Sequence, residues 1–309
     1  MEPAEIHAGI NITPVKFQLV ELERYSEQFR ILNVAELSFN QPIDFETENE
    51  FEINLKLQGA FDQIQQSTNL RTGSFSFSLP PSLFYFHQTP YDNTMVHNDL
   101  IEEFRWELSV LFPFVNVNNL GIQYLEIEKN PVININTAII FALPRKFLQI
   151  LKIFCSTNHY QLKFIEASNI AAERSVLYSN EKLFDGITAS IDISSNVISI
   201  ILSSNGNIVY QNYLKTEYLP DALDFIDAEL KSSGIKKINR NILSRVYLSG
   251  QKVDNEIANN IKNITNQLPV VFNPFKAVSA IPAVSDNHFF NSLNNSFAAA
   301  AGSAYRIAG

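Results

Sequence analysis

The chain has 309 residues, more than one hydrophobic core usually supports, so its length predicts two domains. Hydrophobic residues make up 46% of the chain and charged residues 18%, which is typical of a packed globular protein and excludes a disordered one. The net charge of −9 and the lack of a Lys/Arg run argue against nucleic acid and anionic membranes as partners.

Cys155 is the single cysteine, which excludes an intramolecular disulfide. It follows the apolar residues Phe147, Leu151 and Phe154, so we expect a buried thiol and not a nucleophile. The first residues lack the basic and apolar regions of a signal peptide, and no apolar run reaches 18 residues. We therefore expect a cytoplasmic protein.

The first 40 residues predict three strands, at 6–12, 15–22 and 29–37, which short turns join into an antiparallel meander. The rest of the first half predicts helices and strands whose limits are set by capping residues and prolines. The helices are expected at 50–68, 99–112, 144–157 and 168–178, and the strands at 74–79, 84–89, 120–128, 136–143 and 161–166.

The second half repeats this pattern after a polar break at 179–182. Three strands joined by short turns are followed by alternating helices and strands. The strands are expected at 187–193, 197–203, 208–214, 245–249 and 270–272, and the helices at 220–232, 254–267 and 290–307. The small residues at 298–302 would let the last helix approach a sheet or another helix closely.

The repeated module predicts an α/β fold of two tandem ribonuclease-H-like lobes, the actin-like ATPase fold, with an inserted subdomain in lobe one. We expect lobe one at 1–180 with the insertion at about 42–130, and lobe two at 181–289. The helix at 290–309 is expected to pack back on lobe one.

Five segments, in order along nearly the whole chain, resemble one known family. Segment 8–22 reads Ala-Gly-Ile-Asn-Ile-Thr-Pro-Val-Lys-Phe-Gln-Leu-Val-Glu-Leu, and the others are Phe-Ile-Glu-Ala at 164–167, Asp-Ile-Ser-Ser-Asn at 192–196, Leu-Ser-Gly-Gln at 248–251 and Asn-Pro-Phe at 273–275. They are similar to segments of the PilM class of type IV pilus assembly proteins, which usually carry Gly-Ile-Asp-Ile-Gly-Ser-Ser-x-Val-Lys-Leu-Val-Glu-Leu at the first.

The resemblance implies a cytoplasmic protein that binds ATP with magnesium. It also implies a protein partner, the short cytoplasmic tail of an inner-membrane protein, and a role in the platform of a pilus or a type II secretion machine. The peptide-binding residues cannot be carried over, because no distinct motif maps onto the insertion.

In this fold two strand turns face each other across a cleft and offer backbone N–H groups and hydroxyls to phosphate. The resemblance places the following residues at a nucleotide site: Asn11, Thr13, Lys16, Asp192, Ser194, Ser195, Asn196, Ser249, Gly250 and Gln251. Asp192 would hold magnesium through water. Asn11 replaces the first aspartate of the family, and Pro14 removes an N–H donor, so we expect a degenerate site.

The same residues fit a simpler interpretation, in which the Asn, Asp and Thr side chains bond the local backbone of turns and Lys16 is a solvated strand residue. The five histidines have no metal-ligand spacing, and no nucleophile elbow or Walker-type loop occurs. We expect a non-catalytic scaffold that binds a partner peptide or tail. The alternatives are an ATP-binding enzyme, either a slow ATPase or a sugar-kinase-like phosphotransferase, and an actin-like protein with a role unrelated to pili.

Overall fold

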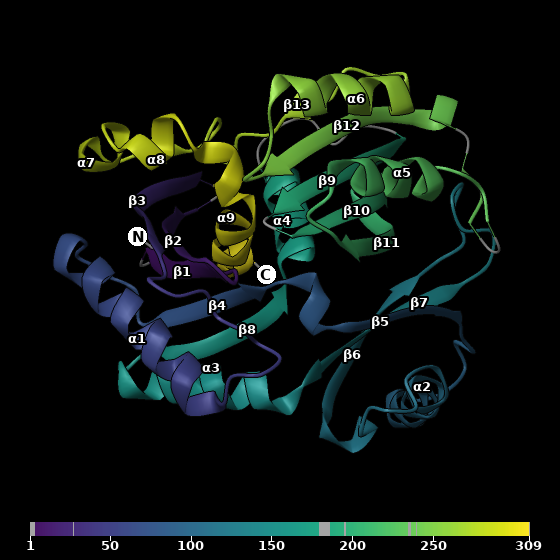
Figure 1. Ribbon diagram of the computed structural model, residues 1–309, viewed down its shortest axis with the longest axis horizontal. Coiled ribbons are helices and arrows are strands. Elements are labelled where there is room, and N and C mark those ends of the chain that lie inside the picture. The colour runs from purple at the N-terminus through teal and green to yellow at the C-terminus, as the bar shows by residue number, and fades with distance from the viewer. Residues whose placement is uncertain are drawn as a thin grey trace.

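The structure is a computed structural model that describes residues 4–26, 28–178, 186–194, 196–233, 236–238 and 240–308. Two large sheets lie in separate lobes, and a smaller sheet stands beside lobe one (Figure 1). Both large sheets have the predicted plan, an antiparallel meander whose first strand pairs in parallel with later strands. The predicted duplication and the α/β fold class are therefore confirmed.

Lobe one contains a six-stranded sheet in the order β14-β3-β2-β1-β4-β8. Its strands are β1 (Glu5–Ile12), β2 (Lys16–Tyr25), β3 (Gln28–Ser38), β4 (Ser74–Leu79), β8 (Gln161–Ala167) and β14 (Ser279–Ala280). Helices α1 (Glu50–Ser67) and α3 (Arg145–Thr157) cover one face. A capping box between Asn49 and Glu52 fixes the start of α1, since each side chain bonds the other residue's backbone N–H.

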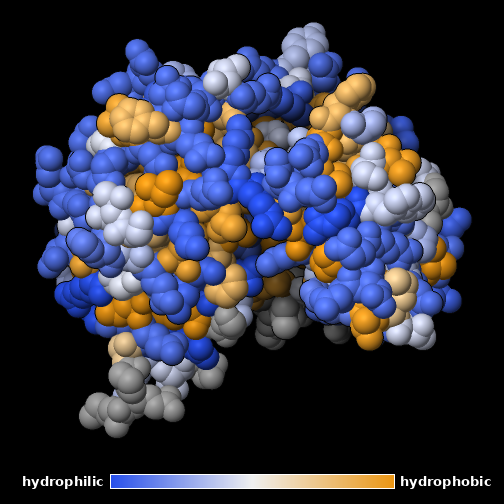
Figure 2. Space-filling view, turned by 90° about the horizontal axis from the view of Figure 1, so that it is seen from below, coloured by the Kyte–Doolittle hydropathy of each residue, from blue (hydrophilic) through white to orange (hydrophobic). Residues whose placement is uncertain are grey.

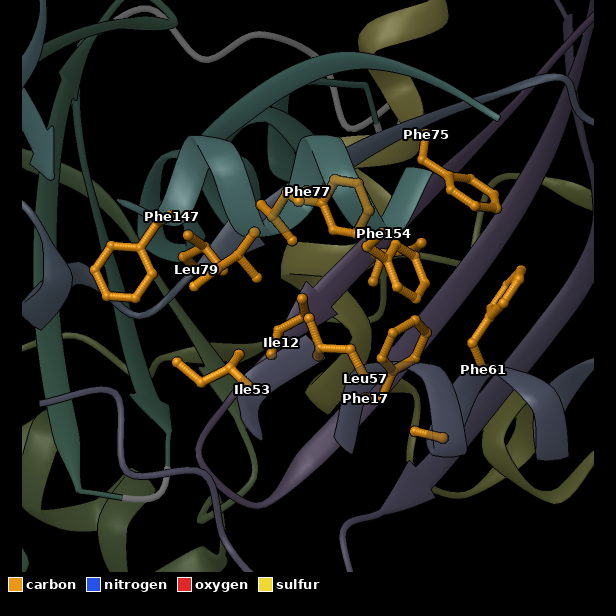
Figure 3. Close-up of a cluster of buried hydrophobic side chains, with 14 of the residues drawn as sticks. Ile12, Phe17, Ile53, Leu57, Phe61, Phe75, Phe77, Leu79, Phe147 and Phe154 are labelled. Carbon is orange, nitrogen blue, oxygen red and sulfur yellow. The ribbon is translucent and has the colours of Figure 1, made fainter. Parts of the chain in front are cut away.

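The alternating sequence of β4 explains how lobe one is packed. Phe75, Phe77 and Leu79 point toward α1 and α3, where the ring of Phe61 meets those of Phe75 and Phe154 edge-on at 5.6 and 5.3 Å (Figure 3). The serines that alternate with them occupy the other face, and Ser76 and Ser78 are fully buried. Both faces of this strand are therefore covered, one by aromatic rings and one by a closely packed layer.

Lobe two has a five-stranded sheet in the order β11-β10-β9-β12-β13. Its strands are β9 (Ile187–Ser194), β10 (Val197–Ser204), β11 (Asn207–Lys215), β12 (Leu243–Gly250) and β13 (Val270–Val271). The outer face packs against α5 (Leu219–Glu229) and α6 (Asn255–Thr265).

The smaller sheet has the order β5-β7-β6 and packs on α2 (His97–Leu111). Its strands are β5 (Tyr85–Pro90), β6 (Leu120–Ile127) and β7 (Thr137–Pro144). The material with its own sheet thus spans 85–144, which differs from the predicted insertion at 42–130. The difference arises because α1 and β4 pair and pack with the lobe-one sheet, a tertiary choice that local periodicity does not report.

Strand β5 and the loop between β6 and β7 also contact lobe two. The backbone N–H of Lys237 donates to Val132 O at 2.6 Å, and the Gln88 side chain donates to Val209 O at 3.1 Å. Val132 and Ile133 are fully buried in the hydrophobic core of lobe two. The insertion therefore contacts both lobes and links them.

Two helices fill the layer between the large sheets: α4 (Ser168–Tyr178) and α9 (Ala298–Ala304). A Cβ added to Gly9 of β1 would lie 2.1 Å from Ala300 O, and one added to Gly302 would lie 1.6 Å from Ala171 O. The expectation that the small residues at 298–302 permit close packing is confirmed.

The expectation of one helix at 290–307 is wrong. Short helices occupy residues 282–308, separated by turns at which the chain changes direction before α9 enters the layer between the lobes. They are α7 (Pro282–Ser285), α8 (His288–Asn291), the 3-10 turns η4 (Asn294–Phe297) and η5 (Tyr305–Ala308), and α9 itself. Further 3-10 turns are η1 (Pro81–Leu83), η2 (Val117–Asn119) and η3 (Arg240–Ile242).

Candidate functional site

Three of the predicted nucleotide-site residues lie at the end of β1, in the turn after it and at the start of β2, and all three bond within the protein. Asn11 donates to Gln18 Oε1 at 2.9 Å and accepts from the Ser78 hydroxyl at 3.0 Å. The Thr13 hydroxyl accepts from Lys16 N at 3.0 Å and closes the turn. The Lys16 ammonium pairs with Glu36 at 2.5 Å. The Thr13 contact agrees with the simpler interpretation of a side chain that bonds local turn backbone, whereas Asn11 bonds the side chains of two other strands and Lys16 is ion-paired and not solvated.

The turn of lobe two is centred on Asp192. Its two carboxylate oxygens accept from the hydroxyls of Ser194, at 2.6 Å, and Ser249, at 2.8 Å. Burial raises the pKa of Asp192, and the two hydroxyl donors oppose that shift. The carboxylate that was predicted to hold magnesium through water thus already has a donor on each oxygen. Ser195 lies outside the described residues.

The third predicted element is the turn after β12, at Gly250 and Gln251. Gly250 has φ +110°, and a Cβ there would lie 2.3 Å from Ile193 O, so this position needs glycine on both counts. The N–H of Gln251 donates to the same Ile193 oxygen at 3.0 Å. The side chain of Asn295 donates to Gly250 O at 2.7 Å, which ties the turn to the C-terminal segment.

The two strand turns do come together, because Thr13, Asp192, Ser194 and Asn196 line one cavity. That cavity measures about 20 Å³. Ligand sites for small molecules usually measure about 300–1,000 Å³. The space between the turns therefore does not fit ATP with magnesium in this arrangement, and we derive no chemistry from it. Contact between the ten residues and a nucleotide was an expectation from the resemblance, and we do not propose it for this arrangement.

A much larger hollow lies at the junction of lobe one and the small sheet (Figure 2). This groove has a volume of about 950 Å³ and runs between β6 and β8, with α3 along one side. Both β6 and β8 are edge strands of their sheets. Two rows of backbone N–H and C=O groups that have no neighbouring strand therefore border the same space.

Apolar and basic side chains share the walls of the groove. Phe141, Leu148 and Phe164 supply part of the apolar surface. The charged lining residues are Arg145, Lys152, Lys163, Arg174 and Arg306, with Glu166 as the acidic residue among the described ones. A net positive groove contrasts with the net charge of −9 of the whole chain.

Glu166 organises the inner end of the groove. Its carboxylate pairs with Arg174, at 2.5 Å, and with Arg306, at 2.9 Å. The guanidinium of Arg306 lies 4.5 Å from the centre of the Phe164 ring, a cation–π contact. Segment 164–167 is part of the family resemblance, but no local sequence pattern marks these residues as a groove, because they come from separate strands and helices that only the tertiary structure brings together.

No family model matches the chain, and no curated protein matches it. A chain in the structure of the PilM-PilN type IV pilus biogenesis complex superposes with a TM-score of 0.72 at 14% identity, over 98% of both chains. The chain described here has an actin-like fold. The predicted resemblance to the PilM class is confirmed at the level of the fold.

Two further solved structures support the fold. A protein from Bacteroides thetaiotaomicron VPI-5482 with an actin-like ATPase fold and unknown function has a TM-score of 0.51 at 13% identity, over 94% of this chain and 95% of that one. The ethanolamine utilization protein EutJ from Carboxydothermus hydrogenoformans has a TM-score of 0.50 at 10% identity, over 98% and 90%. The actin-like fold therefore rests on more than one comparison.

Among the described residues, no helix is long and apolar enough to cross a membrane. Within the same residues, no three His, Cys, Asp or Glu side chains gather where they could hold a metal ion. Cys155 is buried as expected, and burial raises the pKa of its thiol to about 12.

Proposed function

We propose that this protein is a non-catalytic actin-like scaffold that holds an extended segment of a protein partner in the groove between β6 and β8. The observation that carries the proposal is the groove itself, which is about 950 Å³ in volume and bordered by two edge strands. An extended segment can add to such an edge as a further strand, with main-chain hydrogen bonds for affinity and side-chain pockets for specificity.

The dimensions and charges of the groove define the partner segment. The seven residues of β8 span roughly 23 Å, so about seven residues of an added strand would pair along it. Lys152 and Lys163 are exposed, and with Arg145 they favour acidic side chains on the bound segment. Apolar side chains that alternate with those acids would meet Leu148 and Phe164.

The likeness to a chain from the PilM-PilN complex supports the same kind of role, in pilus or secretion assembly, with a partner that corresponds to PilN. The closed space between the strand turns supports a scaffold over an enzyme. We propose that the cleft acts as a structural joint, in which Asp192, Ser194 and Ser249 hold the second turn and no nucleotide is bound.

Site-specific photo-cross-linking tests the groove. A photoreactive phenylalanine analogue replaces Phe164, which is 39% exposed at the groove, and in a control it replaces Phe51, which is 75% exposed on α1. The expected result in the native host is a cross-link from position 164, and none from position 51, to an extended acidic segment. Equal cross-linking from both positions would reject the groove.

A groove-filling variant makes the test specific. The nearest atom to a Cβ added at Gly121 of β6 is Leu143 O at 3.8 Å, so Gly121→Trp can extend into the groove without a backbone clash. Gly59→Trp is the matched control, since nothing lies within 4 Å of a Cβ there and Gly59 is on α1. We expect Gly121→Trp to abolish the cross-link from position 164 and Gly59→Trp to leave it unchanged.

A further inference from the structure

The solvent-facing side of α2 carries large apolar side chains, although α2 lies at the periphery with the small sheet between it and lobe two (Figure 1). Leu100, Phe104 and Leu108 face the small sheet and are buried, as in any amphipathic helix. The opposite side of such a helix is normally polar. Here Trp106 is 67% exposed and Val110 is 59% exposed, so α2 has a second apolar surface that nothing in the described chain covers.

Four exposed positions of α2 form one continuous stripe, which consists of Asp99, Glu102, Trp106 and Val110. Residues three or four apart on a helix are neighbours, so this spacing places the four side chains next to one another. The acidic groups occupy the N-terminal half of the stripe and the apolar groups the C-terminal half. Side chains with this spacing form the ridge against which a second helix packs.

The charge of α2 defines what can pack there. The helix carries four acidic residues, Asp99, Glu102, Glu103 and Glu107, and one basic residue, Arg105. Arg105 lies 3.5 Å from Glu102, whose side chain stays 72% exposed. Lys or Arg side chains on a bound segment would complement this acidic surface, and the exposed indole ring of Trp106 also attracts cations.

Two other occupants fit the stripe less well. A second copy of this chain would bring two acidic surfaces together, and a stable interface takes about 20–30 residues a side, far more than this stripe supplies. The carboxylates and the net charge of −9 would repel an anionic membrane.

We propose that the α2 stripe binds an amphipathic helical segment of a protein partner, in which apolar side chains are flanked by Lys or Arg. The apolar side chains of that segment cover Trp106 and Val110, and its basic side chains pair with Asp99 and Glu102. The small area makes this a transient contact. The stripe residues do not line the groove between β6 and β8, so this site is independent of the one proposed there.

Trp106 is the single tryptophan of the chain, so intrinsic tryptophan fluorescence reports on the stripe alone. The probe is a synthetic peptide of 15 residues, the length of α2, made of Leu at helical spacing and Lys elsewhere. A control peptide has Glu in place of every Lys. Titration of the full chain with the Leu/Lys peptide should shift the Trp106 emission to shorter wavelength and saturate, whereas the Leu/Glu peptide should leave the emission unchanged.

Substitutions assign the binding to the stripe. The double variant Asp99→Asn/Glu102→Gln should weaken binding of the Leu/Lys peptide about fivefold, since each exposed ion pair contributes little alone. The matched control is Asp221→Asn/Asp224→Asn, because these exposed acids have the same spacing near the start of α5 and should not affect the Trp106 signal. Val110→Ser should also weaken binding about fivefold through lost apolar contact.

The proposal would be overturned if the Leu/Lys peptide caused no saturable shift up to about 100 μM, or if the Leu/Glu peptide caused an equal shift. Equal weakening by the two double variants would also overturn it. So would a shift in the protein alone as its concentration rises, which would indicate a second copy, or a shift with phosphatidylcholine vesicles, which would indicate a lipid surface.

Discussion

Gly302 gives the sharpest test of how the two lobes are joined. A Cβ at this position would lie 1.6 Å from Ala171 O, less than half the usual van der Waals separation of about 3.5–4.0 Å. Overpacking of a tight interior typically costs about 1–3 kcal/mol, and a clash with backbone belongs at the upper end. The substitution Gly302→Ala would also gain about 1 kcal/mol of helix propensity in α9. We therefore expect Gly302→Ala to lower the free energy of unfolding by about 2 kcal/mol.

Gly59→Ala is the control, because Gly59 also lies inside a helix but nothing is within 4 Å of its Cβ. There only the helix propensity changes, and we expect the free energy of unfolding to rise by about 1 kcal/mol. Urea unfolding followed by far-UV circular dichroism measures both, with the midpoint shifted and the slope unchanged. If Gly302→Ala proved as stable as the wild type, close packing of α9 on α4 could not be what joins the lobes.

Three further predictions follow from the buried groups and the closed cleft. The thiol of Cys155, whose pKa burial raises to about 12, should not react with an aromatic disulfide reagent at pH 8 until urea unfolds the chain; rapid reaction of the native protein would contradict its burial. Calorimetry with Mg-ATP should show no binding, whereas micromolar binding that disappears in Asp192→Ala would reject the closed cleft. Burial raises the pKa of Glu173, so the contribution of its protonated carboxyl to stability is present below the ordinary pKa of 4.5 and is lost as the pH rises through the raised native value. Glu173→Gln should therefore gain stability relative to the wild type as the pH rises from 4.5 to 8, and a constant difference would contradict the raised pKa.

The local sequence was sufficient to predict the type and position of most helices and strands. Strict alternation in β4 and the apolar periodicity of α3 identify a strand and a helix directly, because each pattern matches the side-chain geometry of one regular structure. The order of those elements predicted two copies of one module, and hence the actin-like fold. The small residues at 298–302 also predict a close helix contact from sequence alone.

Tertiary structure alone decided where the insertion begins, how the C-terminal segment is broken, and what the site residues do. The sequence shows a serine or an asparagine in a turn but does not show whether it faces solvent or another chain segment. The side-chain amide of Asn11 donates to Gln18 and accepts from Ser78, and Ser249 donates to Asp192 from a strand 57 residues away. The groove depends on two edge strands of different sheets that share one space, and no local pattern encodes that contact, because it arises from packing between residues far apart in the chain.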